Sequence, residues 1–413
     1  MPDRRERNLC DPEEGVFLTS HIAFFNFPAF GHLNPTLGVV AELVRRGHRV
    51  SCTTTDRFAP AIEAAGAEPV RYTSVFGEYY TNPFTPEAIS GEGLRTLEEA
   101  TSLAAQVEGF YGENRPDVIL HDFMAWGARF YAAQHDIPLV RLFPSYGFNE
   151  HFSIQAKFPM AEMTDPKVME MIAKLEGMLP ELGFPGKTAM EFLMEPAGLG
   201  IIFLPREFHY DGDTFDERFV FAGPCLGDRS AFQGTWRPAS EDRPVLYLSL
   251  GTAATGWPEF FHTSLEALGG SDWQVLLSVG DTVDPAELGT LPGNFDVRRS
   301  FPQLDVLQRA SLFVTHGGMN SVMESLYNGV PMIVIPQMSE QRANGMRVDE
   351  LGFGRLLPRE DFTAESLRKS VEEVAADQAV AARTKDMGRR MREVDGPALA
   401  ADAVEEYLAR RTA

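Results

Sequence analysis

SLFVTHGGMNSVMESLYNGVPMIVIPQMSEQ, residues 311–341, joins two apolar runs through a glycine-rich turn and a helical pattern. The apolar run 311–315 predicts a buried parallel strand, and the turn 316–318 ends it. Apolar residues recur at helical spacing over 319–327, and 331–336 predicts a second buried strand, so the unit is β-turn-α-β. Such a turn presents free backbone N–H groups and the positive end of a helix dipole to an anion. We therefore expect a nucleotide phosphate at this turn.

The side chains around the turn are those that a nucleotide sugar requires. Three of them offer donors to phosphate oxygens: His316, Asn320 and Ser321. Glu324 lies one helical turn further on the same face, where a carboxylate could accept from ribose hydroxyls. Glu340 and Gln341 follow the next strand at the same edge of the sheet and could bind sugar hydroxyls. Each residue alone also fits a tight turn with a capping Asn and a solvated Glu, but their order favours a nucleotide sugar.

The motifs resemble a known family. With Ser300-Phe301-Pro302-Gln303 upstream, the run P-Q…H-G-G-x-N-S-x-x-E…G-x-P…P-Q-x-x-E-Q resembles the donor signature of family 1 glycosyltransferases, the UDP-glycosyltransferase superfamily. GHLNP, DVILHD, FAGPCLGDR and LSLGTA extend the likeness to bacterial macrolide and flavonoid glycosyltransferases. The resemblance implies an α/β GT-B fold, in which two Rossmann-like parallel-sheet domains face each other across a cleft. The acceptor would bind the first domain and the nucleotide sugar the second.

The domain organisation follows from alternating strand and helix patterns. The first βα turn, FPAFGHLNP, lacks G-x-G-x-x-G, which disfavours a nicotinamide or flavin enzyme. The resemblance implies that the last helix packs back on the first domain. The expected parts are a frayed tail at 1–20, an N-terminal acceptor-binding domain at 21–223, a linker at 224–243, a C-terminal nucleotide-sugar domain at 244–397 and a helix at 398–413.

Composition narrows the partners and the location. The 413 residues suffice for two domains with separate cores. A formal net charge of −22 argues against nucleic acid and against an anionic membrane surface. Three cysteines without metal-ligand spacing fit a reducing cytoplasm, and the first twenty residues turn acidic before any apolar stretch. We expect a cytoplasmic protein without membrane insertion; the oligomeric state stays open.

Two residues of the first domain are the candidate catalytic pair. His32 follows the first strand and Asp122 ends the fourth, which places both at the carboxyl edge where open α/β sheets keep ligands. Asn34 before Pro35 predicts the N-cap of the following helix. Without the resemblance, such a His is more often a structural hydrogen bonder and such an Asp a helix cap. The resemblance implies that His32 is the general base for the acceptor hydroxyl, that Asp122 orients its ring, and that the reaction inverts the anomeric centre.

The resemblance also implies how the donor is held. The departing diphosphate would be stabilised by the helix start and by nearby donors, without a metal: Gly251, Thr252, His316, Gly317, Gly318, Asn320 and Ser321. Plant members carry a Trp for uracil stacking where this chain has Ser300, followed by Phe301, so we expect both UDP-glucose and dTDP-glucose to serve, UDP-glucose being favoured. Asp211-Gly212-Asp213 matches a D-x-D metal motif, but a turn is the stronger interpretation. We expect no metal and no cofactor beyond the UDP-glucose co-substrate.

Aromatic and methionine-rich segments indicate an apolar acceptor such as a macrolide, a flavonoid or another polyphenol. The candidate acceptor residues are Phe76, Tyr79, Phe84, Phe148 and Phe152. Methionines at 160–194 favour a core, although flexible Met also suits a pocket for varied ligands. Two alternatives stay open: a sugar-nucleotide epimerase, and a non-catalytic glycosyltransferase-like activator. The biological role, such as antibiotic resistance, biosynthesis or detoxification, is not encoded.

Overall fold

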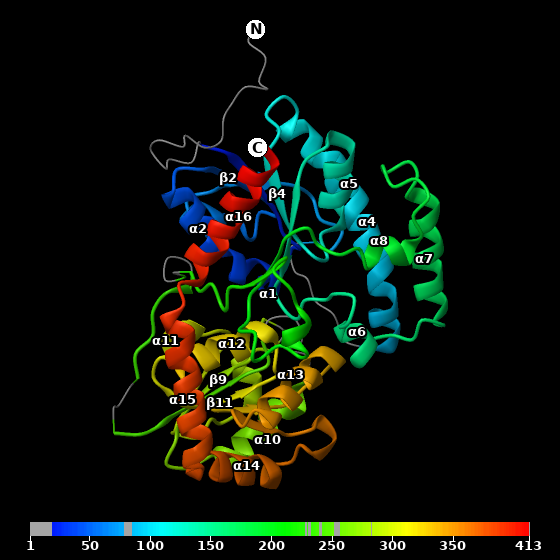
Figure 1. Ribbon diagram of the computed structural model, residues 1–413. Coiled ribbons are helices and arrows are strands. Elements are labelled where there is room, and N and C mark those ends of the chain that lie inside the picture. The colour runs from blue at the N-terminus through cyan, green and yellow to red at the C-terminus, as the bar shows by residue number, and fades with distance from the viewer. Residues whose placement is uncertain are drawn as a thin grey trace.

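The chain forms two parallel β-sheets with helices on both faces of each (Figure 1). A computed structural model describes residues 19–77, 85–227, 229, 233–238, 242–251, 257–281 and 283–412. The expected tail at 1–20 lies almost wholly outside the described residues, as do Tyr79, Phe84 and Thr252.

The first sheet is built on β1, whose five residues are all buried. Its strands are β1 His21–Phe25, β2 Arg49–Thr54, β3 Glu68–Arg71, β4 Val118–Asp122, β5 Leu139–Phe143, β6 Gly200–Ile202 and β7 Phe219–Phe221. Among the described residues, the strand order is β3-β2-β1-β4-β5-β6-β7. The order reverses between β1 and β4, which pair in parallel from Ile22 with Val118 to Phe25 with His121. Ligands of open α/β sheets bind at such a switch point, beyond the carboxyl ends of the strands.

Helices cover the first sheet, and the segment 154–194 between β5 and β6, here called the helical excursion, adds α6, α7 and α8. They are α1 Phe30–Leu33, η2 Asn34–Thr36, α2 Leu37–Arg45, α3 Ala59–Ala64, α4 Pro86–Tyr111, α5 Trp126–His135, α6 Ile154–Lys157, α7 Pro166–Met178, α8 Ala189–Leu193 and η3 Gly212–Thr214. Figure 1 shows α6, α7 and α8 on one side of the molecule, with α7 outermost. The prediction that Asn34 caps a helix was wrong: helical backbone begins at Phe30, and Asn34 has αR angles within a continuous turn rather than the extended angles of a cap.

The second sheet repeats the design. Its strands are β8 Val245–Ser249, β9 Gln274–Ser278, β10 Phe295–Arg298, β11 Ala310–Thr315, β12 Met332–Val334 and β13 Gly354–Leu356. In the described part of the chain they are ordered β10-β9-β8-β11-β12-β13, with a reversal between β8 and β11. The turns after β8 and β11 therefore lie side by side, and they contain Gly251, His316, Gly317 and Gly318 of the predicted diphosphate-binding set.

The helices of the second half alternate with its strands and then follow the last strand. They are α10 Pro258–Leu268, η4 Pro285–Leu288, α11 Gln303–Leu307, α12 Met319–Asn328, α13 Ser339–Glu350, η5 Arg359–Asp361, α14 Ala364–Ala376, α15 Gln378–Glu393 and α16 Gly396–Thr412. The sequence did not predict α11. Helices α14 and α15 are separated at Asp377, whose side chain caps α15 by accepting from the N–H groups of Ala379 and Val380.

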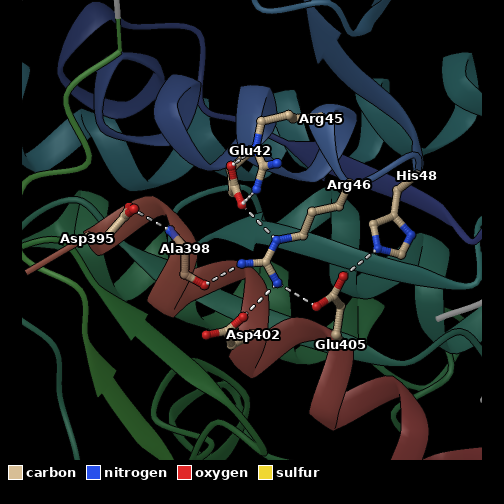
Figure 2. Close-up of polar contacts among 8 residues, drawn as sticks. All are labelled: Glu42, Arg45, Arg46, His48, Asp395, Ala398, Asp402 and Glu405. Atoms are coloured by element: carbon tan, nitrogen blue, oxygen red, sulfur yellow. Dashed lines mark hydrogen bonds and ion pairs between the residues drawn. The ribbon is translucent and has the colours of Figure 1, made fainter. Parts of the chain in front are cut away.

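Helix α16 crosses from the second half of the chain and packs against α2 of the first (Figure 1). Arg46, at the end of α2, donates to Glu42 within its own helix and to Asp402 and Glu405 of α16. His48 accepts from the Ser20 N–H through Nδ1, so its Nε2–H donates to Glu405 (3.0 Å). Figure 2 shows this network, which also contains Arg45, Asp395 and Ala398.

The two halves of the chain touch at the carboxyl edges of their sheets. Asn320 Nδ2 donates to Gly31 O (3.0 Å), and Ser145 Oγ donates to Glu340 Oε1 (2.9 Å). We call the region between these two contacts the domain junction. Beside it, Tyr210 Oη donates to Ala343 O (2.8 Å), and one apolar core cluster contains residues of both halves. No helix among the described residues has the length and apolar character needed to cross a membrane.

Candidate functional site

His32 and Asp122 lie together although 90 positions separate them. His32 belongs to the short helix α1 after β1, and Asp122 is the last residue of β4. The Nδ1–H of His32 donates to Asp122 Oδ2 (2.7 Å), and the other oxygen of the Asp122 carboxylate accepts from the Met124 N–H (2.8 Å). Asp122 is fully buried, whereas the His32 side chain keeps 22% exposure. The fixed Nδ1–H leaves Nε2 as the ring atom that can accept a proton.

The electrostatic surroundings raise the pKa of His32. Burial of the imidazole lowers it, but the charge of Asp122, the hydrogen bond to it and the charge of Glu340 outweigh the burial. Burial has the opposite effect on Glu340. It raises the pKa of this carboxyl group above the usual value, although hydrogen bonds from Asn344 and Ser145 act to lower it. A raised pKa suits a general base near neutral pH.

On the other side of the domain junction, His316 lies between two glycines. A Cβ atom placed on Gly251 would be 2.5 Å from His316 Cε1, and one on Gly318 would be 2.5 Å from Nε2. Gly251 also has a φ of +78°, which favours glycine. Burial lowers the pKa of His316 to about 4, so the ring is neutral at pH 7 and can donate through one N–H.

Helix α12 begins directly after this turn, with Gly318 as its N-cap residue and without a side-chain cap. The first N–H groups of α12 are therefore available to an anion. Gly317 is held on both sides, since its N–H donates to Thr315 Oγ1 (3.2 Å) and its carbonyl accepts from Asn344 (2.8 Å). The predicted phosphate donor Asn320 instead contacts Gly31, next to His32, and so lies between the two halves of the site.

The predicted ribose acceptor Glu324 is buried with two partners. Its Oε1 accepts from Arg229 Nη1 (2.8 Å) and its Oε2 from Gln303 Nε2 (2.7 Å). Gln303 Nε2 also donates to Ser321 Oγ (3.2 Å). The structure thus gathers Gln303, Ser321 and Glu324 from the predicted set and adds Arg229, whose Nε has no acceptor among the described residues.

Known proteins match the chain over nearly its full length. A model of the UDP-glucoronosyl and UDP-glucosyl transferase family matches residues 229–384. NDP-glycosyltransferase YjiC of Bacillus licheniformis is 42% identical over 398 residues, which are 94% of this chain and 98% of that protein. Oleandomycin glycosyltransferase of Streptomyces antibioticus is 34% identical over 399 residues, 95% of this chain and 92% of that protein. The chain belongs to the UDP-glycosyltransferase family.

A solved structure supports the same assignment. The calicheamicin glycosyltransferase CalG4 superposes with a TM-score of 0.81 at 36% identity, over 95% of this chain and 99% of that one. The predicted family and GT-B fold class are thereby confirmed, and the protein is a glycosyltransferase. The family implies a nucleotide sugar and a small-molecule acceptor as its substrates.

The position predicted for the nucleobase, at Ser300 and Phe301, presents no open aromatic ring. Ser300 is exposed, whereas Phe301 is only 7% exposed and packs its edge against Tyr247. The guanidinium of Arg298 lies 4.9 Å from the centre of the Phe301 ring. Phe301 can therefore face a base through its backbone, while its ring belongs to the core.

The two residues predicted to bind the sugar differ in the polar groups that remain available. Glu340 Oε1 already accepts from Ser145 and from Asn344 (2.8 Å). Gln341 is buried, and its Oε1 accepts from the Gln337 N–H (2.8 Å), which fixes the turn before α13. Its amide NH₂ group is the part left to contact a sugar.

The aromatic residues predicted for the acceptor fall into two groups. Phe76 packs on Phe27, which in turn contacts the His32 ring at 5.0 Å, so Phe76 lies near the catalytic candidates. Phe148 is half-buried and packs on Phe143. Phe152 is buried in an aromatic cluster with Tyr146, His209, Tyr210 and Phe215 and serves the core.

The methionines of the helical excursion mostly face solvent. Exposed fractions reach 57% at Met163 and 58% at Met169, and only Met171 of the set is buried. Most of these methionines therefore neither pack in a core nor line a pocket. The other exposed members are Met160, Met190 and Met194.

Asp211 and Asp213 belong to a tight turn. Asp211 has a φ of +50° and precedes the 3-10 turn η3, and Thr214 Oγ1 donates to its carbonyl (2.8 Å). In the described part of the chain, no three His, Cys, Asp or Glu side chains gather as a metal site would require. Independence from metal stays a prediction.

Sequence reasoning missed three polar residues of the site. Asn344 lies one helical turn after Glu340, so helical spacing could have found it. Ser145 follows β5 at the same edge as Asp122. Arg229 was quoted within FAGPCLGDR but assigned to the linker, because an aperiodic segment gives no signal of where its side chains point.

Proposed function

We propose that this protein is an inverting, metal-independent glycosyltransferase that moves glucose from UDP-glucose to a hydroxyl of an apolar natural product, giving a β-glycoside. The observation that carries the proposal is the contact between Asn320 and Gly31, which brings the start of α12 next to the α1 turn with His32. A base and an anion site then lie on opposite sides of one reacting centre.

In this proposal each residue has a defined chemical task. His32 Nε2 takes the proton of the acceptor hydroxyl while Asp122 stabilises the resulting imidazolium. The acceptor oxygen forms a bond to the anomeric carbon as the bond from that carbon to the diphosphate oxygen breaks. The negative charge of the leaving diphosphate is stabilised by the N–H groups at the start of α12 and by neutral His316.

The donor and acceptor classes rest on different arguments. Gln303 and Glu324 are the proposed ribose ligands, and Arg229 holds the Glu324 carboxylate in place. Relatives named for macrolide chemistry, such as oleandomycin glycosyltransferase and demethyllactenocin mycarosyltransferase, support a bulky natural-product acceptor. Phe27 and Phe76 beside His32 supply an apolar wall for it. The relatives' names favour group transfer over epimerisation.

The test is a transfer assay with UDP-glucose and a panel of macrolides and polyphenols in the presence of EDTA. Mass spectrometry should find a hexose adduct, and the proton coupling of its anomeric centre should identify the β-anomer. His32→Ala should abolish transfer to alcohols while UDP affinity changes little. His262→Ala, at an exposed histidine of α10, is the control and should keep full activity.

Three results would each overturn a part of the proposal. Undiminished turnover by His32→Ala would remove the base assignment. Loss of activity in EDTA that Mg²⁺ or Mn²⁺ restores would remove the metal-independent mechanism. An isomerised nucleotide sugar without any adduct would favour an epimerase instead.

A further inference from the structure

A cavity of about 270 Å³ lies under α5, on the face of the first sheet opposite to Asp122. Neighbouring strand residues point to opposite faces, so His121 points into this cavity while Asp122 points toward His32. Arg141 pairs with His121 in the register of β4 and β5 and lines the same cavity. The cavity extends to Gly198, before β6, and is distinct from the domain junction.

Two arginines of the cavity are deeply buried. Arg129 of α5 is 4% exposed and Arg141 of β5 is 6% exposed. Arg129 donates to Phe192 O (2.6 Å) and to the Glu195 carboxylate. Within the described residues, the one hydrogen-bond acceptor of Arg141 is the backbone carbonyl of Glu195 (2.6 Å). A guanidinium has five N–H donors, so Arg141 keeps several of them for a ligand.

Two arginines and two carboxylates, those of Asp136 and Glu195, line the cavity, but the carboxylates compensate the arginines only in part. Glu195 shares its carboxylate between Arg129 and Lys187, and no carboxylate of the described residues forms an ion pair with Arg141. Burial, with the nearby charge of Arg129, lowers the pKa of Arg141 to about 9. Burial also lowers the pKa of Arg129 to about 10. The lowered pKa values indicate that nearby negative charge does not fully balance the two buried guanidinium groups. A bound anion would supply the missing negative charge.

His121 completes the polar wall. Its Nδ1–H donates to Asp122 O (2.9 Å), so in the neutral ring Nε2 carries no proton. Burial and the charges of Arg141 and Arg129 hold the pKa of His121 well below its usual value. An anion bound beside the arginines would offset their charges and so raise the pKa of His121, while the effect of burial would remain.

We propose that this cavity binds a small organic anion, whose carboxylate or phosphate group pairs with the guanidinium groups of Arg141 and Arg129. A planar guanidinium matches both head groups through two parallel hydrogen bonds. Apart from the exposed Asp136, the remaining walls are mainly apolar, including Ile137, Leu139 and Phe184, and suit a compact hydrocarbon body. The anion would act neither as donor nor as acceptor of the transfer reaction.

The test uses the full chain, with inorganic phosphate and benzoate as separate probes in a buffer free of other oxyanions. We expect either probe to raise the melting temperature in proportion to the logarithm of its concentration. Nuclear magnetic resonance should show the His121 imidazole signals moving toward the protonated form. Phosphate acting alone identifies a phosphate ligand, and benzoate acting alone identifies a carboxylate that also needs the apolar walls.

Variants separate binding from structure. Arg141→Met should weaken binding roughly tenfold or more, and in probe-free buffer it should melt at or above the wild-type temperature because it removes an uncompensated buried charge. Arg141→Lys keeps the charge but not the fork and should bind with intermediate strength. Arg410→Met, at an exposed arginine of α16, should change neither quantity. Absence of binding by both probes, or binding that Arg141→Met and Arg141→Lys leave unchanged, would overturn the proposal.

Discussion

At the scale of single residues, the raised pKa of His32 depends on its neighbours and not on exposure. Burial alone would lower the pKa of the ring below 6.5, and Asp122 supplies the largest opposing effect. A general base must be unprotonated to act, so activity should fall as the pH drops through this raised pKa.

Asp122→Asn should therefore move the acid limb of kcat/KM to lower pH, because the amide removes the charge that raises the pKa of His32 while the burial remains. The maximal rate should also fall, by up to about 10⁴-fold, since the imidazolium loses its stabilising carboxylate. Glu340→Gln should shift the limb in the same direction by less. A pH profile of each variant measures both effects. An acid limb at the wild-type pH in Asp122→Asn would show that Asp122 does not raise the pKa of His32.

Ser300→Trp should narrow the choice of nucleotide donor. The ring of Phe301 is buried and Ser300 is small and exposed, so a base bound at this position would lack an aromatic platform and a thymine methyl group would have room. We expect the wild type to use both UDP-glucose and dTDP-glucose, and the variant to favour uracil by an additional factor worth on the order of 1 kcal/mol. The ratio of kcat/KM for the two donors decides this, and an unchanged ratio would show that Ser300 does not set base choice.

At the scale of elements, the two turns beyond β8 and β11 form one unit around His316. A side chain at Gly251 or Gly318 would collide with the His316 imidazole, and Gly251 also has a positive φ that favours glycine.

Gly251→Ala should weaken donor binding and leave the acid limb of the pH profile unchanged. The new methyl group would displace His316, and the φ of +78° adds strain of about 1 kcal/mol. Gly270→Ala is the matched control, since its φ is +73° but no heavy atom lies within 4 Å of the new methyl group. Equal Kd values for UDP in both variants, measured by calorimetry, would contradict the role of His316 as a phosphate donor.

The sequence predicts elements where local signals agree with burial. Helix α10 is an example, because Pro258 suits its first position and Gly269 follows its last residue. His32 and Asp122 were predicted at one edge of the sheet because the carboxyl ends of parallel strands share an edge, and the two side chains are hydrogen-bonded there.

The parts that failed are those that tertiary contacts decide. β13 has only three residues at a sheet edge, too few for a period to be visible. The contact of Arg229 with Glu324 joins residues 95 positions apart, and no pattern in an aperiodic segment encodes such a pairing. Ser145 and Glu340 likewise meet only when both halves of the chain have folded.

At the scale of the whole molecule, the two halves are joined at the domain junction and again through α16. The contacts of Arg46 with α16 are partly buried, with 18% exposure of its side chain. Removing one partner of such a pair costs more than removing one at the surface, because the other charge stays partly buried without compensation.

Arg46→Met should lower the free energy of unfolding by about 2 kcal/mol, since Glu405 would keep only His48 as a partner. The loss should shrink as the pH falls below about 4.5. The hydrogen bond from Arg45, with that from Arg46, lowers the pKa of Glu42 to about 2, so this carboxylate stabilises the fold above its unfolded value of 4.5 and loses that effect as the pH falls toward 2.

Urea denaturation of wild type, Arg46→Met and Arg410→Met at pH 7 and pH 4 measures this prediction. Arg410 pairs with Glu406 at the surface of α16, and its replacement should cost about 0.5 kcal/mol or less at either pH. A similar loss in both variants would show that the network in Figure 2 adds nothing beyond surface pairing.

The position of α16 also constrains how a nascent chain can mature. Arg46 and its partner Asp402 are 356 positions apart, and Ala400, Ala401, Val404 and Leu408 complete the apolar cluster that contains Val40 and Leu43 of α2. During synthesis the first domain emerges long before these residues, so its α2 surface stays uncovered while the second domain is translated. Chaperones that bind exposed apolar surfaces could bind α2 during this time. A truncated chain that ends before α16 would keep this apolar surface exposed and would be prone to aggregate.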